Sequence, residues 1–367
     1  MPRKGENIYK RKDGRWEGRY IKNRDKKHKA VYGYLYGRTY TEVKDKLKQV
    51  KLSNVTNSVP TISFGQIVDS WFQNKRLCVK ESTLAHYKTI IDKHILPLLG
   101  EYDISTIDTD TVQQYMNELI DDGYASKTAS DILTVIKSIL KYVSCKGVEH
   151  NCDLSIVALK NQKSDIQTLT LFEQRKLCDY LITNINNRNF GILLCLYTGI
   201  RIGELCALKW SDIDVREKFL KIEKTMIRIR DNCSIQKDCK TKVIITPPKS
   251  EDSVRTIPIS NFLFSIIKKL RRNPNAYILT GACDNFLEPR NMQYYFKTVL
   301  KKCGLRDVKF HILRHTFATR CVENGFEIKS LSEILGHSSI KITLDRYVHS
   351  SMDLKRKNMD KLNFLSA

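Results

Sequence analysis

Two polar stretches without helical periodicity divide this chain into three parts, and this division limits the possible folds more than any other feature. Residues 53–63, which contain Pro60, and residues 148–168 both show the composition that is typical of linkers. The three parts differ in their apolar patterns, which predicts a multidomain protein. We expect a small α+β sheet domain at residues 1–55, an all-α domain at 63–150, and a mixed, mainly α domain with a β-hairpin region at 165–367.

The first part combines aromatic residues, glycines and a large excess of positive charge. Its first 50 residues contain 16 Lys or Arg and 6 Asp or Glu, a surplus of 10 positive charges. Alternating aromatic and polar residues predict short strands at 8–10, 16–20 and 30–36, with a turn at Asp13–Gly14. A helix is predicted over residues 41–52. A folded three-stranded sheet is favoured over a disordered basic tail, because the aromatic residues supply apolar surface to bury.

Apolar residues recur with helical spacing through most of the remaining chain. The second part is predicted to form helices at residues 64–77, 82–98, 108–121 and 126–146. Pro97 and Gly100 are expected to end the second of these helices. In the third part, the pattern predicts a strand-rich region at 213–258, flanked by helices at 170–186, 189–198, 203–208, 260–271, 291–303, 312–323, 328–335 and 340–347.

The charge and the apolar pattern exclude several functional classes. A formal net charge of +23 indicates a polyanionic partner, with DNA or RNA as the first candidate and an anionic membrane surface as the second. Apolar runs of about 18 residues are absent, so no membrane-spanning helix is expected. Residues 1–12 lack the apolar stretch of a signal peptide. We therefore expect a cytoplasmic protein, associated with the nucleoid in a bacterium, in which a disulfide or metal role for Cys233 and Cys239 is disfavoured.

Arg201 and Lys249 are the first two residues that point to phosphate chemistry. Arg201 lies where a new helix is predicted to begin, after a turn at Gly199, and a helix N-terminus favours anions. Glu204 is interpreted as a partner that orients Arg201 and not as a base. Lys249 lies in a turn-like segment at or near a hairpin tip, where a lysine can reach into a site, and Lys242 is its alternative.

Histidines and one tyrosine complete the set. His311 and Arg314 are three residues apart and so share one helix face. A zinc site at His311 and His315 is disfavoured because Arg314 would repel the cation, and His315 is interpreted as a packed or capping residue. His337 follows Gly336, which is expected to end a helix, and Tyr347 lies on one face of the next helix.

These side chains suit the transfer of a DNA strand without a metal ion. Arginine binds a phosphate through two fixed donors, lysine or histidine can protonate a leaving oxygen, and tyrosine can form a covalent intermediate. No carboxylate cluster suited to magnesium and no P-loop is present in the sequence. In their order along the chain, the residues resemble the active site of the tyrosine recombinases, or lambda-integrase family: Arg201, Lys249, His311, Arg314, His337 and Tyr347.

The resemblance covers about residues 165–350 and implies a function and partners. It implies a site-specific recombinase of a mobile element that needs no cofactor and binds double-stranded DNA. The sheet domain would bind arm-type DNA sites, and the helical domain would bind core-type DNA sites. The resemblance further implies a monomer when free, a homotetramer on DNA, accessory DNA-bending or excision factors, and no membrane partner. The candidate DNA-binding residues are Lys10, Arg11, Arg15, Trp16, Arg19, Tyr20, Lys75 and Lys127.

Two features and two alternatives stay open. Residues 228–242 form a long insertion relative to simple family members, and residues 351–367 could dock on a neighbouring copy or pack on their own domain.

A type IB topoisomerase shares the tyrosine chemistry, and a catalytically silent DNA-binding regulator could share the scaffold. The basic sheet domain favours an integrase over the topoisomerase, and the six occupied positions favour an enzyme over the regulator. Phage and conjugative-transposon origins cannot be separated by this chemistry.

Overall fold

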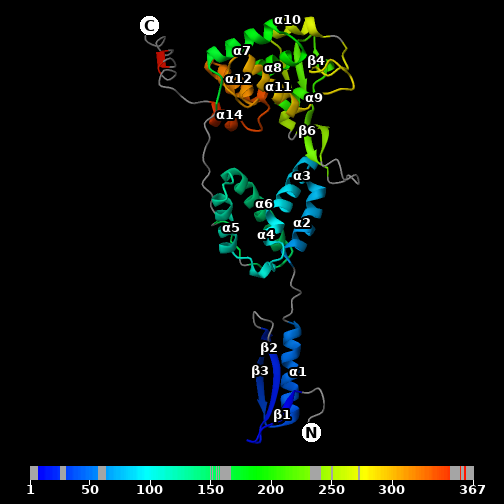
Figure 1. The fold of residues 1–367 in the computed structure, drawn as a ribbon, viewed down its shortest axis with the longest axis vertical. Coiled ribbons are helices and arrows are strands. Elements are labelled where there is room, and N and C mark those ends of the chain that lie inside the picture. Colours follow the sequence, from blue (N-terminus) through cyan, green and yellow to red (C-terminus); the bar gives the residue numbers. More distant parts are fainter. Residues whose placement is uncertain are drawn as a thin grey trace. The chain divides into compact units, whose positions relative to one another are not determined.

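The computed structural model describes residues 7–24, 30–56, 63–148, 167–231, 241–248, 251–271 and 273–347, together with a few isolated positions (Figure 1). The chain divides into two compact units: residues 1–78 with 88–160, and residues 79–87 with 161–367. Within these described ranges, no helix combines the length and the apolar character needed to cross a bilayer.

The N-terminal segment forms the predicted three-stranded sheet. Strands β1 (Ile8–Lys10), β2 (Trp16–Arg24) and β3 (Ala30–Gly37) pair antiparallel in sequence order, and helix α1 (Tyr40–Thr56) packs on one face. A Cβ atom at Gly18 would lie 2.6 Å from Val43, so the helix approaches the central strand directly at this glycine. The helix continues beyond the predicted end at Leu52 to Thr56, because no glycine or proline interrupts it before Pro60.

The helical segment contains the predicted helices, with one difference. Its elements are α2 (Phe64–Cys78), α3 (Glu81–Ile90), a π-helical turn (Ile91–Ile95), α4 (Leu96–Leu99), a 3₁₀ turn (Ile104–Thr106), α5 (Thr109–Asp121) and α6 (Ser126–Cys145). The single helix predicted at 82–98 is thus three pieces. Pro97 lacks an N–H group and its ring would clash with the Lys93 carbonyl in a regular α-helix, and the wider π turn relieves this clash.

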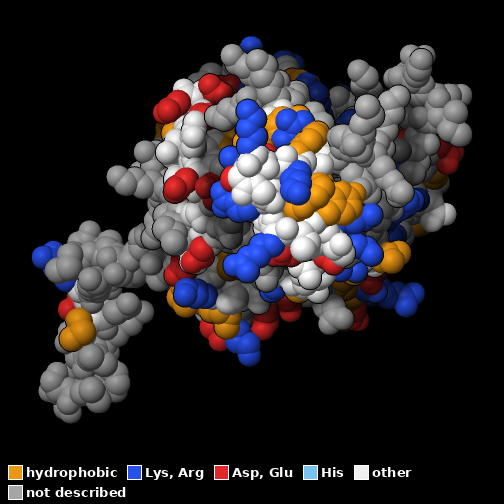
Figure 2. Space-filling view, turned by 90° about the horizontal axis from the view of Figure 1, so that it is seen from below, with side chains coloured by type: hydrophobic (Ala, Val, Ile, Leu, Met, Phe, Trp, Pro, Cys, Tyr) orange, Lys and Arg blue, Asp and Glu red, His pale blue; other side chains and the backbone are white. Residues whose placement is uncertain are grey.

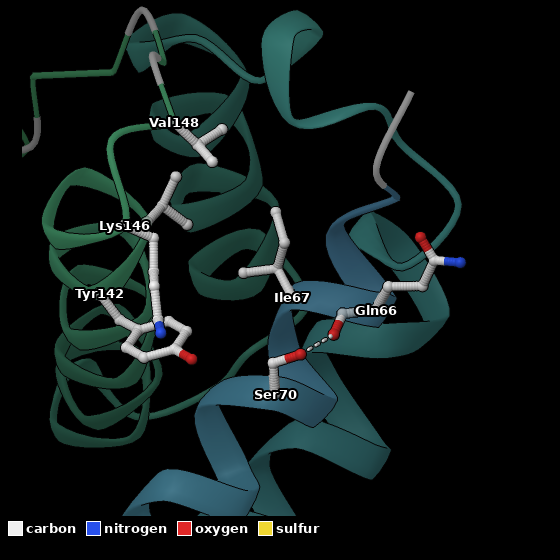
Figure 3. A pocket seen from close by; sticks show the side chains of 7 residues that line it. Gln66, Ile67, Ser70, Tyr142, Lys146 and Val148 are labelled. Atoms are coloured by element: carbon white, nitrogen blue, oxygen red, sulfur yellow. Dashed lines mark hydrogen bonds between the residues drawn. The ribbon is translucent and has the colours of Figure 1, made fainter. Parts of the chain in front are cut away.

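A pocket of about 290 Å³ lies between α2 and the end of α6 (Figure 3). In this pocket the Ser70 hydroxyl donates a hydrogen bond to the Gln66 carbonyl at 3.0 Å. Apolar and polar side chains both line it, namely Gln66, Ile67, Ser70, Tyr142, Val143, Lys146 and Val148. The two helices are therefore separated at this end, while Trp71 and Ile139 are fully buried in the core of the same segment.

The C-terminal unit is mainly helical, and its central helix is α8 (Asn187–Thr198). Residues 189–196 of this helix are all buried, and it packs against α7 (Leu171–Thr183), α10 (Asn261–Leu270) and α12 (Ile312–Glu323). The remaining helices are α9 (Ile202–Ala207), α11 (Pro289–Lys302), α13 (Ile328–Leu335) and α14 (Ile340–Tyr347). The predicted helix at 170–186 ends earlier, at Thr183, and Asn186 instead caps α8.

Two small sheets form the predicted strand-rich region. Strands β4 (Ile213–Asp214), β5 (Phe219–Ile222) and β8 (Arg255–Pro258) make one antiparallel sheet. Strands β6 (Thr225–Arg230) and β7 (Thr241–Thr246) pair as the extended arms expected around residues 228–242. The segment that joins these arms, with Cys233 and Cys239, lies outside the described residues. The predicted fold class, with a sheet domain, a helical domain and a mainly helical domain with strands, is confirmed.

Candidate active site

Arg201 lies in the junction between α8 and α9. Gly199 ends α8 in the left-handed conformation, with φ +66°, and a Cβ atom there would lie 2.5 Å from the Phe317 ring. Arg201 then precedes the first residue of α9. Its guanidinium donates to Glu204 Oε1 at 2.8 Å and to the Gly336 carbonyl at 3.0 Å. These bonds fix the direction of a half-buried arginine.

Glu204 is a buried carboxylate between two arginines. Arg255 Nη1 and Nη2 donate to its two oxygens at 3.1 and 2.8 Å, and Arg201 lies on its other side. Burial alone would raise the pKa of Glu204, but the hydrogen bonds and charge of Arg255, with the charge of Arg201, outweigh burial and lower it. The carboxylate therefore stays ionised at neutral pH, which suits an orienting role and not that of a base.

Three consecutive carbonyls at the end of α13 each accept a hydrogen bond from a different arginine. Along residues 334–336, the donors are Arg255 Nε at 2.6 Å, Arg314 Nη2 at 2.7 Å and Arg201 Nη2 at 3.0 Å. The last carbonyls of a helix lack partners within the helix and carry partial negative charge. Gly336 ends this helix with φ +64°, as predicted. The end of α13 thus holds three guanidinium groups together.

Arg314 is the most deeply buried of the predicted site residues that the structure describes. It lies on α12, and its Nη1 donates to the Gly199 carbonyl at 2.8 Å. Burial and the positive charge of Arg201 lower its pKa to about 9, while Glu204 acts in the opposite direction. The guanidiniums of Arg201 and Arg314 bind the neighbouring carbonyls of Gly336 and Leu335, so their positive charges repel each other. An oxyanion such as a phosphate would relieve this repulsion.

The histidines of the site are neutral at physiological pH. His311 begins α12, and its ring lies 4.6 Å from that of His315, nearly perpendicular to it. His337 follows α13, and its Nδ1 lies 2.9 Å from Thr343 Oγ1. Displacement of water by the surrounding protein and nearby positive charges lower the pKa of His311 to about 4 and that of His337 to about 3.

Tyr347 is the last residue of α14, and its side chain is almost fully buried. Its hydroxyl lies 2.8 Å from His315 Nδ1. Its ring is parallel to that of His337, with 6.4 Å between the ring centres. Burial raises the pKa of the phenol, and the charges of Arg314, Arg346 and Arg201 oppose this rise. The phenol oxygen therefore lies within the field of both predicted arginines.

The structure brings five of the six predicted site residues to one place: Arg201, His311, Arg314, His337 and Tyr347. Lys249 lies outside the described residues, and its alternative, Lys242, lies on β7 within 3.9 Å of Asp231. The sequence reasoning did not anticipate Arg255, or that His315, interpreted as packed or capping, contacts the tyrosine. Alternation along β8 could have indicated Arg255, because it shares an inward face with Ile257.

The candidate DNA-binding residues of the sheet domain lie on both faces of the sheet. Trp16 and Tyr20 pack beside Val43 and Leu47 on the helix side, so they belong to the domain core. Strand alternation places Arg19 on the opposite, open face, with its guanidinium 4.4 Å from the centre of the Tyr32 ring. The open face is rich in exposed tyrosines, which are Tyr9, Tyr32, Tyr34 and Tyr36.

Other basic candidates are exposed or pack along aromatic rings. Arg11 and Arg15 lie 5.6 and 5.8 Å from the ring centre of Tyr36, and Lys10 lies 6.0 Å from that of Trp16. In the helical segment, Lys75 lies 5.8 Å from the ring centre of Trp71, and Lys127 pairs with Asp131 at 2.7 Å. Figure 2 shows one face of the molecule, where Lys and Arg side chains are interspersed with hydrophobic ones.

Comparison with known families identifies the class of protein. Residues 167–353 match the phage integrase family, and residues 63–120 match the phage integrase N-terminal SAM-like domain. The first match spans half of the chain, and the chain therefore belongs to the phage integrase family of tyrosine recombinases. It is a site-specific DNA recombinase, related to the integrases of mobile elements. The predicted family, function and enzyme class are confirmed.

Individual relatives resemble the chain over most of its length. A XerC-like tyrosine recombinase of Caldanaerobacter subterraneus subsp. tengcongensis is 29% identical, covering 93% of this chain and 94% of the relative. The transposase of transposon Tn916 from Enterococcus faecalis is 24% identical, covering 78% and 74%. Among solved structures, the Tn1549 transposon integrase with a circular intermediate DNA has a TM-score of 0.66, at 21% identity, covering 82% of this chain and 99% of that chain. A lambda integrase dimer bound to a core site has a TM-score of 0.60, at 20% identity, covering 95% and 97%.

Proposed function

We propose that this recombinase integrates and excises a mobile genetic element by cutting and rejoining double-stranded DNA through a 3′-phosphotyrosine intermediate at Tyr347. The observation that carries the proposal is the meeting of Tyr347 with the site histidines beside the two arginines. The Tyr347 hydroxyl lies 2.8 Å from His315 Nδ1 and its ring is parallel to that of His337, while Arg201 and Arg314 bind neighbouring carbonyls at the end of α13. The similarity to the Tn916 transposase and to the Tn1549 integrase, which is solved with circular intermediate DNA, supports a mobile element as the substrate.

Each residue has a role that its chemistry suits. Tyr347 attacks the scissile phosphorus, and Arg201 and Arg314 neutralise the charge that develops on the phosphoryl oxygens. His311 and His337 donate hydrogen bonds to the non-bridging oxygens. Lys249, which lies outside the described residues, is assigned the role of general acid for the 5′ oxygen. The phosphotyrosine bond conserves the energy of the phosphodiester, so rejoining needs neither a cofactor nor ATP.

The sheet domain is proposed to bind arm-type sites, and the helical domain core-type sites. In the sheet domain, the open face presents Arg19 and the exposed tyrosines, while Trp16 and Tyr20 support that face from the core. Arginine and tyrosine donate hydrogen bonds to phosphates and base edges. In the helical domain, Lys75 and Lys127 remain the candidate contacts. Integration needs a second type of site, whereas a type IB topoisomerase needs only the site that it cleaves.

Four copies are proposed to act together on DNA, with a monomer as the free form. A lambda integrase tetramer bound to a Holliday junction has a TM-score of 0.59 at 20% identity, which supports this arrangement. Accessory DNA-bending or excision factors are proposed to set the direction of the reaction. Most of the segment after Tyr347 lies outside the described residues, so docking of residues 351–367 on a neighbour is a separate proposal.

A nicked suicide substrate, built from the ends of the element, tests the proposal. Cleavage should leave a covalent protein–DNA adduct that survives SDS, and Tyr347→Phe should abolish it while DNA binding is retained. An enzyme that relaxes supercoiled DNA but never joins two sites would instead be a topoisomerase. Binding without any adduct in the wild-type protein would support a silent regulator.

A further inference from the structure

A histidine outside the predicted set lies within hydrogen-bond distance of the phenol oxygen of Tyr347, which Arg314 also approaches. His315 Nδ1 lies 2.8 Å from Tyr347 Oη, and the two residues come from different helices, α12 and α14. Only 5% of the surface of Tyr347 is exposed, so this contact forms largely out of bulk water. A short bond between an imidazole nitrogen and a buried phenol is the geometry that proton transfer between them requires.

The direction of this hydrogen bond follows from the protonation states of the two groups. Partial burial, Arg346 and Arg314 lower the pKa of His315 to about 4, and burial raises the pKa of Tyr347. At neutral pH both groups are therefore uncharged. The phenol then donates its proton toward Nδ1, and the ring proton of His315 is carried by Nε2.

We infer that His315 is the proton acceptor for Tyr347 when the phenol attacks the scissile phosphate. This inference rests on the proposed function. During cleavage, the bond from Tyr347 Oη to phosphorus forms, the bond from phosphorus to the 5′ oxygen breaks, and the phenol proton moves to His315 Nδ1. The 5′ oxygen takes its proton from the general acid. During rejoining, the 5′ hydroxyl attacks and gives its proton back to the general acid, the phosphotyrosine bond breaks, and the imidazolium of His315 returns its proton to Tyr347.

The other two histidines are less well placed for this proton. His337 Nδ1 is engaged by Thr343 Oγ1 at 2.9 Å, and its ring lies parallel to that of Tyr347. The ring of His311 packs nearly perpendicular to the ring of His315, with 4.6 Å between their centres, and not against the phenol. Both remain available to a phosphate. The hydrogen bond to the phenol therefore separates the role of His315 from theirs.

Substrate binding makes His315 a better base. The groups that act on it in the free protein are His311, which precedes α12, Arg314 on α12, and Arg346 and Tyr347 on α14. The arginines disfavour a second positive charge on the imidazole. A bound phosphate brings negative charge against the same arginines, which raises the pKa of His315 toward the range in which it can hold a proton. The base is thus strengthened when the scissile phosphate is in place.

Adduct formation by His315→Asn as a function of pH tests the inference. Asparagine places a hydrogen-bonding atom near the position of Nδ1 but cannot take a proton. We expect single-turnover cleavage to fall by about 10²-fold or more at neutral pH, with a rate that rises with pH as hydroxide replaces the lost base. In His315→Ala, added imidazole should restore part of the rate. His311→Asn is the matched control and should keep the wild-type shape of the pH profile.

A substrate with sulfur in place of the 5′ bridging oxygen distinguishes loss of the general base from loss of the general acid. A thiolate leaves without being protonated, so this substrate should rescue a general-acid variant but not His315→Asn. A wild-type rate and pH profile in His315→Asn, with DNA binding intact, would overturn the inference and leave the proposed function standing. A rate that rises with pH in His311→Asn but keeps the wild-type profile in His315→Asn would instead assign the base to His311. If the wild-type protein forms no adduct, the proposed function itself fails.

Discussion

Arg255 and Glu204 form a bidentate ion pair in which both side chains are almost fully buried, with 5% and 2% of their surfaces exposed. Glu204 in turn contacts Arg201, the first of the site arginines. Arg255 therefore acts on the site through another residue. Removing it leaves a buried carboxylate with one cation in place of two, and that cation is the half-exposed Arg201.

Arg255→Met should destabilise the C-terminal unit strongly, because loss of one partner of a buried ion pair costs about 3–5 kcal/mol. Thermal or denaturant unfolding measures this cost. Arg228→Met is the matched control, since its pair with Glu288, at 2.6 Å, is more exposed and should contribute only about 0–1 kcal/mol. Similar losses of stability in the two variants would show that burial of the Glu204 pair has no special importance.

Gly199→Ala should impair both folding and cleavage. Alanine in a left-handed conformation costs about 1–2 kcal/mol, and the new methyl group would also lie 2.5 Å from Phe317. Displacement of the Gly199 carbonyl would also release Arg314. Gly325→Ala is the control, because Gly325 has φ +76° but no atom lies within 4 Å of the place that its new methyl group would take. Equal stability of the two variants, measured by thermal unfolding, would argue against the steric contribution.

Acidification should destabilise the free protein before its carboxylates titrate. The pKa of His337 falls from 6.5 in the unfolded chain to about 3 in the folded site, so between these values the unfolded state binds more protons. The destabilisation is absent above about pH 6.5 and grows as the pH falls toward about 3. His337→Gln should lose less thermal stability than the wild-type protein between about pH 7 and pH 5. Equal losses would exclude His337 as a contributor.

The arm-site binding proposed for the sheet domain should depend on the open face of the sheet. Tyr34→Ala and Arg19→Gln should weaken binding to arm-type DNA without unfolding the domain, since Tyr34 is 49% exposed and pairs opposite Arg19 on that face. If Arg19 contacts a phosphate, Arg19→Gln should lower the slope of log K against log salt by about 1. Trp16→Ala should instead destabilise the domain, because Trp16 packs against its core. Unchanged binding by both open-face variants would place the DNA elsewhere.

The sequence predicted backbone features better than contacts between elements. Gly199 and Gly336 were expected to end helices, and both do so in the left-handed conformation, because glycine adopts it without a steric penalty. The π turn at Ile91–Ile95 was missed, since helical periodicity does not distinguish π from α geometry over one turn. The predicted ends of α1 and α7 were also displaced by three residues or more.

In the candidate site, too, the sequence predicted residues better than the contacts between helices. Order and residue type led to two arginines and a tyrosine that the structure brings together. The contact between His315 and Tyr347 depends on how α12 and α14 pack, and spacing within one helix carries no information about that packing. Lys249 remains a prediction, because it lies outside the described residues.

The three arginines that bind the end of α13 would all move if that end of the helix moved. Because carbonyls 334–336 are consecutive, a small displacement of this end of α13 would shift all three guanidiniums together. Arg201 and Arg314 are the two proposed to bind the phosphate, and Arg255 holds Glu204. Cleavage competence should then be gained or lost as a whole and not by degrees. Any contact that moves this one turn would therefore be enough to switch cleavage on or off.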